Sequence, residues 1–458
     1  MTKAVEDHLA ANYQAALEEL KAFCRLPSVS TDAAYEDGIR AASQFVANGL
    51  GRSGLPTVEI IETGGHPVVF AEGPKVPGKP TVLVYGHYDV QPPDPLDKWK
   101  SPPFEPTIRD DRLYARGVSD DKGPMLIPIL VARAFAEVDG GPPLNLKFLI
   151  EGEEESGSPH FEQAVESLKD RLACDVVVSA DGAMWRPDLP SVTVAGRGLA
   201  ALEVTVHGAA KDLHSGRHGG SAPNAVRALA RMLASLHDDD GNVIVEGFAS
   251  TALPPDPAIR EAIKAACFDS ERYFDEIGAE HPAPLPDGEE LLTRQWLVPT
   301  LEFNGISGGY AGPGTKTVIP GSASAKITCR LVRGQEPDAV HEAITAHLRR
   351  VLPSGYRLEV HNHGPGTVAF GLDSDLPAMA IAEDVLEPLL GARPLRVAMG
   401  ATIPICSVFE THLGVGTIFF SFSTSDEDYH APNEFLRLAN FRLGMTAWVR
   451  LLEGLAKL

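Results

Sequence analysis

Short hydrophobic runs alternate with longer helical stretches along the first half of the chain. Three of these runs end directly at polar residues, namely TVLVYG (81–86) before His87, LKFLIEG (146–152) before Glu153 and DVVVSA (175–180) before Asp181. Between the first two, residues 120–138 have the length and apolar content of a helix that opens with acids. Continuous apolar strands connected by helices predict an α/β fold with a mostly parallel sheet flanked by helices.

The middle of the chain has a different pattern. Residues 199–208 and 317–332 alternate between apolar and polar positions, as half-exposed antiparallel strands do, and each is followed by a helical stretch, 224–238 and 339–352. This pattern predicts a smaller α+β domain. Apolar helical character returns near 380, and a last apolar run, 415–423, precedes a polar segment. We therefore expect a catalytic domain formed by 1–197 and 379–458, with a second domain inserted at 198–378.

Composition and charge narrow the classes of function. Lys and Arg total 40 against 62 Asp and Glu, a formal net charge of −22, which argues against a nucleic-acid partner. The most apolar stretch, 125–135, is too short to span a membrane, and the N-terminal segment lacks the apolar core of a signal peptide. The five cysteines are scattered and form no CxxC pair, which favours a reducing compartment. The expectation is a cytoplasmic protein with no membrane partner.

Acids and histidines gather where the predicted strands end. In sheets of this kind, ligands bind at the carboxyl ends of the strands. Histidine nitrogens and carboxylate oxygens suit a divalent metal, zinc above all. Each cluster also has an ordinary interpretation: Asp120 and Asp121 could begin a helix, Glu153–Glu155 could form a solvated turn, and His430 could lie in a loop. Their coincidence at strand ends favours a metal site.

Seven motifs in order carry a resemblance to a known family. They are HYD (87–89), ARGVSDDKG (115–123), EGEEESGS (151–158), SADG (179–182), DLHSGRHGG (212–220), KTVIP (316–320) and DYHAPNE (428–434). The chain resembles the di-zinc metallopeptidase family of carnosinase, cytosolic non-specific dipeptidase, glutamate carboxypeptidase, aminoacylase and acetylornithine deacetylase. The likeness is greatest to the dipeptidase and carnosinase branch.

The resemblance implies two divalent metal ions per subunit, Zn²⁺ above all, with Mn²⁺ or Co²⁺ as alternatives. One ion would be bound by His87, Asp120 and Asp181, and the other by Asp120, Glu155 and His430, so that Asp120 bridges the pair. Glu154 would be the general base and Asp89 would orient His87.

The resemblance also implies substrate contacts. His214 would stabilise the oxyanion in the partner subunit's site, so a homodimer formed through the inserted domain is expected. Arg330 would bind the C-terminal carboxylate of the substrate, with Thr317 as a further contact and the metal ligands Asp181 and His430 beside the substrate. The branch usually has Arg-Glu-Gly-Gly-Ser-Ile-Pro where this chain has AMGATIP (398–404), in which Thr402 keeps a hydroxyl for the carboxylate.

The function that the resemblance implies is hydrolysis of a dipeptide or short peptide by a water activated between two metals. An alternative in the same reaction class is an N-acyl-amino-acid amidohydrolase, for which the substrate would be an N-acyl amino acid. A non-catalytic metal-binding protein is a third possibility, but such a protein would have no use for an unligated base at Glu154.

Overall fold

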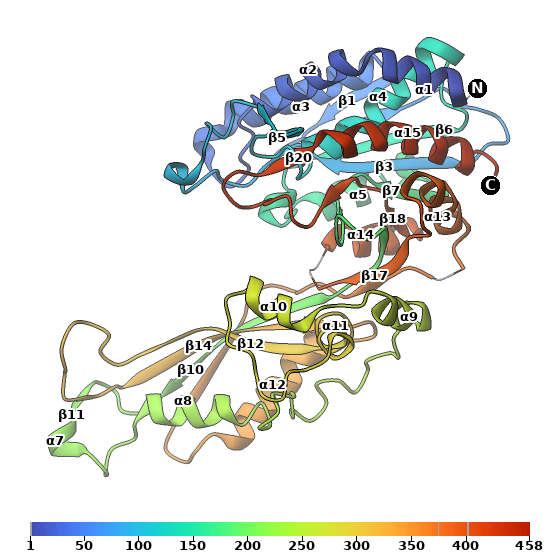
Figure 1. Cartoon of the computed structure of the whole chain (residues 1–458). Coiled ribbons are helices and arrows are strands. Elements are labelled where there is room, and N and C mark those ends of the chain that lie inside the picture. Colours follow the sequence, from blue (N-terminus) through green and yellow to red (C-terminus); the bar gives the residue numbers. More distant parts are fainter. Residues whose placement is uncertain (1, 374, 401–402) are drawn as a thin grey trace. The chain divides into compact units, whose positions relative to one another are not determined.

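The computed structural model describes residues 2–373, 375–400 and 403–458, and these residues form two compact units (Figure 1). The first unit comprises 1–194, 372–397 and 404–458, and the second comprises 195–371 and 398–403. The chain therefore leaves the first unit twice, for the long insertion 195–371 and again for the short stretch 398–403. The sequence analysis expected the insertion at 198–378.

The first unit is built on a six-stranded sheet with the order β1-β2-β6-β3-β7-β18. Its strands are β1 (Thr57–Ile61), β2 (Val68–Glu72), β3 (Thr81–His87), β6 (Asn145–Glu151), β7 (Val176–Ser179) and β18 (Thr417–Phe419). The four strands that the apolar runs predicted, β6, β3, β7 and β18, pair in parallel. The unpredicted strands β1 and β2 add an antiparallel edge, so the sheet is mixed.

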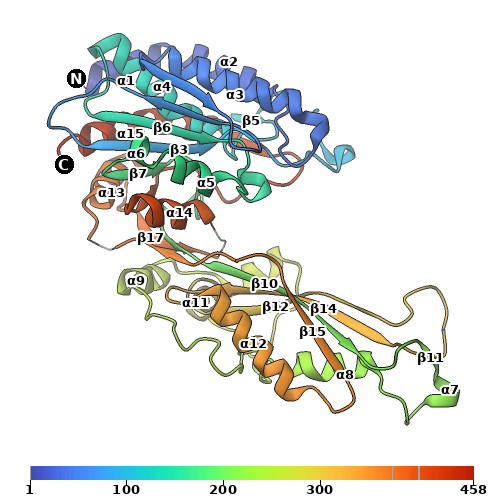
Figure 2. The ribbon, with the colours of Figure 1, turned by 180° about the vertical axis from the view of Figure 1, so that it is seen from behind.

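Helices cover both faces of this sheet (Figures 1 and 2). They are α1 (Thr2–Ala11), α2 (Tyr13–Cys24), α3 (Glu36–Gly51), α4 (Lys122–Asp139), α5 (Phe161–Ser167), α6 (Lys169–Leu172), α13 (Pro377–Leu390), α14 (Pro404–Leu413) and α15 (Leu438–Leu455). A side chain at Gly86 of β3 would collide with Met125 of α4, so α4 lies directly on that face. The neighbouring residue Tyr85 points to the opposite face, where its ring packs edge-on against Phe161 and Phe409.

Shorter elements complete the chain between these layers. Two small sheets in the first unit have the orders β20-β5-β4 and β19-β8. Apart from one short pair of strands in the second unit, the strands outside the main sheets of the two units are β4 (Thr107–Arg109), β5 (Arg112–Tyr114), β8 (Ala183–Met184), β9 (Ser191–Gly196), β16 (Phe370–Gly371), β17 (Leu395–Met399), β19 (Ser423–Thr424) and β20 (Phe435–Arg437). The 3₁₀ helices are η1 (Ala33–Tyr35), η2 (Leu96–Lys98) and η3 (Glu154–Ser156).

The second unit contains an antiparallel sheet of order β12-β14-β10-β15, and two of the unit's helices, α8 and α12, pack against one face of it. Buried and half-exposed residues alternate strictly along β10, as the sequence pattern predicted, and the buried face packs in one core with α8 and α12. The elements are β10 (Gly198–His207), β11 (Leu213–His214), β12 (Thr300–Gly308), β13 (Val318–Ile319), β14 (Ser322–Leu331), β15 (Arg357–Asn362), α7 (Ser215–His218), α8 (Ala225–Ala234), α9 (Pro257–Ala265), α10 (Ser270–Glu276), α11 (Gly288–Leu297) and α12 (Pro337–Val351).

The segment 251–298 of the second unit contains three helices, α9, α10 and α11. Across the part of the chain that the structure describes, every helix is too short or too polar to cross a lipid bilayer.

Candidate metal centre

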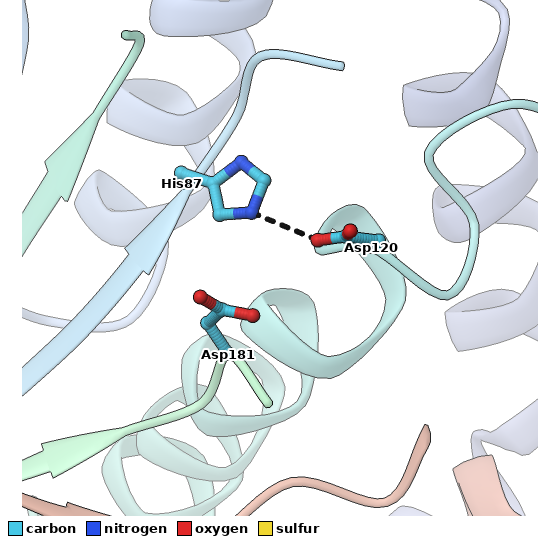
Figure 3. Close-up of side chains that lie close together, drawn as sticks. All are labelled: His87, Asp120 and Asp181. Carbon is cyan, nitrogen blue, oxygen red and sulfur yellow. Dashed lines mark hydrogen bonds and ion pairs between the residues drawn. The ribbon is translucent and has the colours of Figure 1, made fainter. Parts of the chain in front are cut away.

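Three residues from separate elements converge at the carboxyl ends of β3 and β7 (Figure 3). His87 is the last residue of β3, Asp181 follows β7, and Asp120 lies in the loop before α4. The Nε2 atom of His87 lies 3.0 Å from Oδ1 of Asp120. One ligand atom from each of the three lies within 4.8 Å of the others, which is close enough for one metal ion. The sheet topology thus brings together residues that are more than thirty positions apart in the sequence.

A second group of donors shares Asp120 with the first. His430 Nε2 lies 3.0 Å from Oδ2 of Asp120 and 3.0 Å from Oε2 of Glu155. The two oxygens of Asp120 therefore face two different histidines. A carboxylate in that position can bridge two ions, and the donors, imidazole and carboxylate, suit hard or borderline divalent metals. The donor set fits a two-metal centre.

The electrostatics of the site also fit bound cations. Burial raises the pKa of Asp181 to about 6 and that of Glu155 to about 7, and the negative Asp120 adds to both shifts. Hydrogen bonds to Asp120 and Glu155 raise the pKa of His430 to about 10. Burial opposes ionisation of Asp120, but hydrogen bonds from His430 and His87 lower its pKa. A dication among these carboxylates would stabilise the ionised forms that burial disfavours.

Asp89 and Gln91 support the donors from the loop that follows β3. Fully buried Asp89 lies 3.3 Å from Nδ1 of His87, and its carboxylate accepts the backbone N–H groups of Glu154 and Glu155 at 3.2 and 3.0 Å. Gln91 Nε2 donates to Oε2 of Glu155 at 2.8 Å. Asp89 therefore holds the imidazole of one donor and the backbone of another, as second-layer partners of metal ligands do. The sequence analysis did not identify Gln91, although it lies only two residues after the HYD motif.

Glu154 lies beside both donor groups and contributes to neither of them within the described residues. Burial raises the pKa of this carboxyl well above its ordinary value; His87 opposes the shift, while Asp181, Asp120 and Glu155 add to it. An unligated carboxylate with a high proton affinity, next to the donors, has the properties of a general base.

The other residues singled out from the sequence belong to the second unit or lie outside the described residues. His214, at the end of β11, accepts the Gly216 N–H on Nδ1 at 3.0 Å, and its Nε2 lies 3.5 Å from the Thr317 hydroxyl. The structure thus brings His214 and Thr317 together. Arg330 lies near the far end of β14, and Thr402 falls outside the described residues.

Glu151, at the end of β6, forms a buried pair with Tyr85, whose hydroxyl donates to Glu151 Oε1 at 2.6 Å. Burial raises the pKa of Glu151 to about 8; the Tyr85 hydrogen bond opposes this and Asp89 adds to it. Glu151 therefore keeps its proton in the folded protein at pH values where the unfolded chain has lost it, that is, above the ordinary glutamate pKa of 4.5. The contribution of Glu151 to stability is complete below that value and is lost as pH rises to about 8.

We expect Glu151→Gln to reduce this loss, because glutamine still accepts from Tyr85 and cannot ionise. The free energy of unfolding of the metal-free variant should fall less than that of the wild type between pH 5 and pH 8. The difference should be a few kcal/mol at most, since one pKa unit corresponds to about 1.4 kcal/mol. Urea unfolding at a series of pH values measures it, and parallel pH curves for the two proteins would contradict the assignment.

Comparison with known protein families gives one model that covers most of the chain. The model described as Peptidase family M20/M25/M40 matches residues 83–454. This range contains every residue of the two donor groups and Glu154.

Individual relatives agree with the family match. The human Beta-Ala-His dipeptidase is 32% identical over 441 residues, which cover 95% of this chain and 85% of the relative. The Cys-Gly metallodipeptidase dug1 of Schizosaccharomyces pombe is 29% identical, with 94% of this chain and 93% of the relative covered. Among solved structures, an M20 family metallo-carboxypeptidase from Sulfolobus solfataricus superposes with a TM-score of 0.85 at 30% identity, covering 97% of this chain and 99% of the other.

Proposed function

The chain belongs to peptidase family M20/M25/M40, and from this premise we propose how its residues hydrolyse a dipeptide. It is a metallopeptidase. Several of its relatives are named as dipeptidases, which supports dipeptides rather than N-acyl amino acids as the substrates of this chain. The observation that carries the proposal is the position of Asp120, whose two oxygens each lie 3.0 Å from a different histidine. This arrangement supports a centre that binds two ions.

His87, Asp120 and Asp181 would hold one ion, and Asp120, Glu155 and His430 the other. When bound, two divalent ions polarise a substrate carbonyl and lower the proton affinity of water. Glu154 then accepts the proton of the water that attacks the amide carbon, and donates it to the nitrogen of the leaving amine. The backbone N–H of Glu154 donates a hydrogen bond to Asp89, which fixes the position of the base beside the metal donors. Two imidazoles and three carboxylates favour zinc, with manganese or cobalt as alternatives.

Binding of the substrate is proposed to involve the second unit. Arg330 would bind the C-terminal carboxylate with its planar guanidinium, while His214 and Thr317 would contact the scissile amide. The hydroxyl of Thr402 would donate a further hydrogen bond to the C-terminal carboxylate of the substrate. The structure describes three of these residues, and His214 and Thr317 lie in contact.

The spacing within the second unit supports a homodimer. Arg330 lies eight positions along β14 from Ser322, at about 3.3 Å per residue, which is about 26 Å of extended strand. His214 pairs with Val318, which precedes that strand. A dipeptide extends about 7 Å at the length of an extended residue, so His214 and Arg330 of one chain would serve different active sites. We infer that each site takes His214 from the partner subunit.

The five cysteines are free thiols in the structure. Free thiols persist in reducing compartments, which supports a cytoplasmic location.

A test of the function compares three compounds as substrates of the same protein, namely a dipeptide, its N-acetyl derivative and an N-acyl amino acid. We expect hydrolysis of the free dipeptide, little or none of its N-acetyl derivative, and little of an N-acyl amino acid. Chelation should abolish the activity, and Zn²⁺, Mn²⁺ or Co²⁺ added back singly should restore it to different extents. Preferential cleavage of N-acyl amino acids would favour the deacylase alternative, and full activity in the chelated protein would overturn the metal assignment.

A further inference from the structure

The loop that carries Asp120 donates several hydrogen bonds to one buried carboxylate, that of Glu434, which has no role in the proposed catalytic steps. Glu434 Oε1 accepts the backbone N–H groups of Ser119 at 2.9 Å and of Asp120 at 3.2 Å. Its Oε2 accepts from the Gly117 N–H and from Arg116 Nη1, both at 2.8 Å. The side chain is inaccessible to solvent. Four donors from one loop therefore satisfy this single carboxylate.

The backbone of Glu434 is fixed as firmly as its side chain. Its carbonyl accepts the Ala115 N–H at 3.2 Å, and the next residue, Phe435, begins β20, which pairs with Tyr114 in β5. His430 lies four positions earlier in the same segment. Glu434 thus joins two stretches of chain that are about three hundred residues apart, one carrying Asp120 and the other carrying His430.

We propose that Glu434 is a positioning residue for the centre: its carboxylate sets the orientation of Asp120 relative to His430. The inference rests on the proposed bridging role of Asp120. Because Asp120 is shared by both donor groups, a change in its backbone affects both ions together. A hydrogen bond to the backbone N–H of Asp120 acts on the ligand itself, whereas a bond elsewhere in the loop only stabilises the fold.

Glutamine at position 434 would remove this arrangement with little change in volume. One oxygen becomes an NH₂ group, which cannot accept, so either the pair Ser119 and Asp120 or the pair Gly117 and Arg116 loses its acceptor. The unsatisfied buried N–H groups can be relieved only by movement of the loop.

Glu427 supplies a matched control in the same segment. It is equally buried, and its carboxylate accepts from Ser119 Oγ at 2.6 Å, from the Thr424 N–H at 3.3 Å and from Arg437. Its bonds reach the side chain of Ser119 and do not reach the backbone N–H of Asp120. Glu427→Gln therefore tests the loss of a buried carboxylate without the loss of that bond.

The experiment titrates Zn²⁺ into metal-free wild type, Glu434→Gln and Glu427→Gln against a chromophoric chelator, and records Tm with and without metal. For Glu434→Gln we expect both dissociation constants to rise by about tenfold or more, as for other residues that orient metal ligands. The rise in Tm on metal binding should shrink in parallel. Glu427→Gln should lower the metal-free Tm while leaving both dissociation constants within about threefold of wild type.

Three results decide the proposal. If Glu434→Gln lowers only the metal-free Tm and binds both ions as tightly as wild type, Glu434 is structural and the inference is wrong. If the wild type itself binds a single ion, the bridging role of Asp120 fails and the inference fails with it. Should Glu434→Gln not fold, Glu434→Asp replaces it, since aspartate keeps both oxygens but withdraws them by one methylene. Wild-type affinity in Glu434→Asp would also overturn the proposal.

Discussion

Replacing Glu154 by glutamine is expected to lower kcat by roughly two or more orders of magnitude, the usual effect of losing a general base. Glutamine has nearly the same shape but cannot accept a proton. The KM should change little, because Glu154 is not proposed to bind the substrate. The metal content should stay at two ions, because Glu154 belongs to neither donor group in the described part of the chain. Steady-state kinetics and elemental analysis of the same preparation measure both quantities.

The neighbouring variant Glu155→Gln is the control for this assignment. Glu155 Oε2 lies 3.0 Å from His430 Nε2, within the second donor group. Losing the charge of Glu155 should weaken binding of the ion proposed for Asp120, Glu155 and His430. Activity should therefore recover partly when the metal concentration is raised. Added metal should not rescue Glu154→Gln. If Glu155→Gln kept both ions and Glu154→Gln lost one, the two roles would have to be exchanged.

A mixture of two inactive variants is expected to regain activity if His214 acts in the partner subunit's site. A His214→Ala chain keeps Glu154 and its donors, while a Glu154→Gln chain keeps His214. Each homodimer should be nearly inactive, because every site lacks either the base or the oxyanion donor. In a mixed dimer one site receives both defects, and the other receives neither.

The size of the recovery follows from the pairing. Random association of equal amounts makes about half of the dimers mixed, provided that the subunits pair by two-fold symmetry. Each mixed dimer has one intact site, so about a quarter of wild-type activity should return. The two chains can carry different affinity tags and be co-expressed, and tandem purification then isolates the mixed species. Purified mixed dimers with no more activity than either parent would show that His214 does not act across subunits.

Much of the fold follows from local patterns. Val82–Tyr85 and Val176–Val178 are continuous apolar runs because parallel strands in the middle of the sheet are buried on both faces, and such runs can be recognised without tertiary information. The strands β1 and β2 at the antiparallel edge were not predicted. Two of the five residues of Thr57–Ile61 are exposed and none is fully buried, so its weak apolar pattern resembles that of a loop.

The buried carboxylates of Glu434 and Glu427, by contrast, could not be predicted from local patterns. Glu434 and Glu427 stand in a polar segment, where a charged residue most often faces solvent, yet both are fully buried. Their partners, Gly117, Ser119 and Arg116, lie about three hundred positions away in the sequence. Gly117 and Ser119 donate backbone N–H groups to Glu434, and such bonds leave no mark on residue type at the donor. Arg116 and the Ser119 hydroxyl donate through their side chains, but the sequence separation conceals which carboxylate each one meets.

The sequence by itself determined which residues are candidate metal donors and that two of them, His87 and Asp181, stand at the ends of strands. His87 and Asp181 directly follow apolar runs, and a parallel sheet places the ends of such strands at one edge whatever the details of packing. The resemblance already implied how the donors divide between two ions, and the tertiary structure decided the direction of each donor side chain. The two oxygens of Asp120 turn toward His87 and His430. Asp89 lies 3.3 Å from Nδ1 of His87 and accepts two backbone N–H groups, and Glu434 accepts the backbone N–H of Asp120. The physical reason is the sequence distance over which each feature is determined. Burial patterns are local and periodic along the chain. The direction of a carboxylate depends instead on hydrogen-bond donors that only the folded chain brings to about 3 Å.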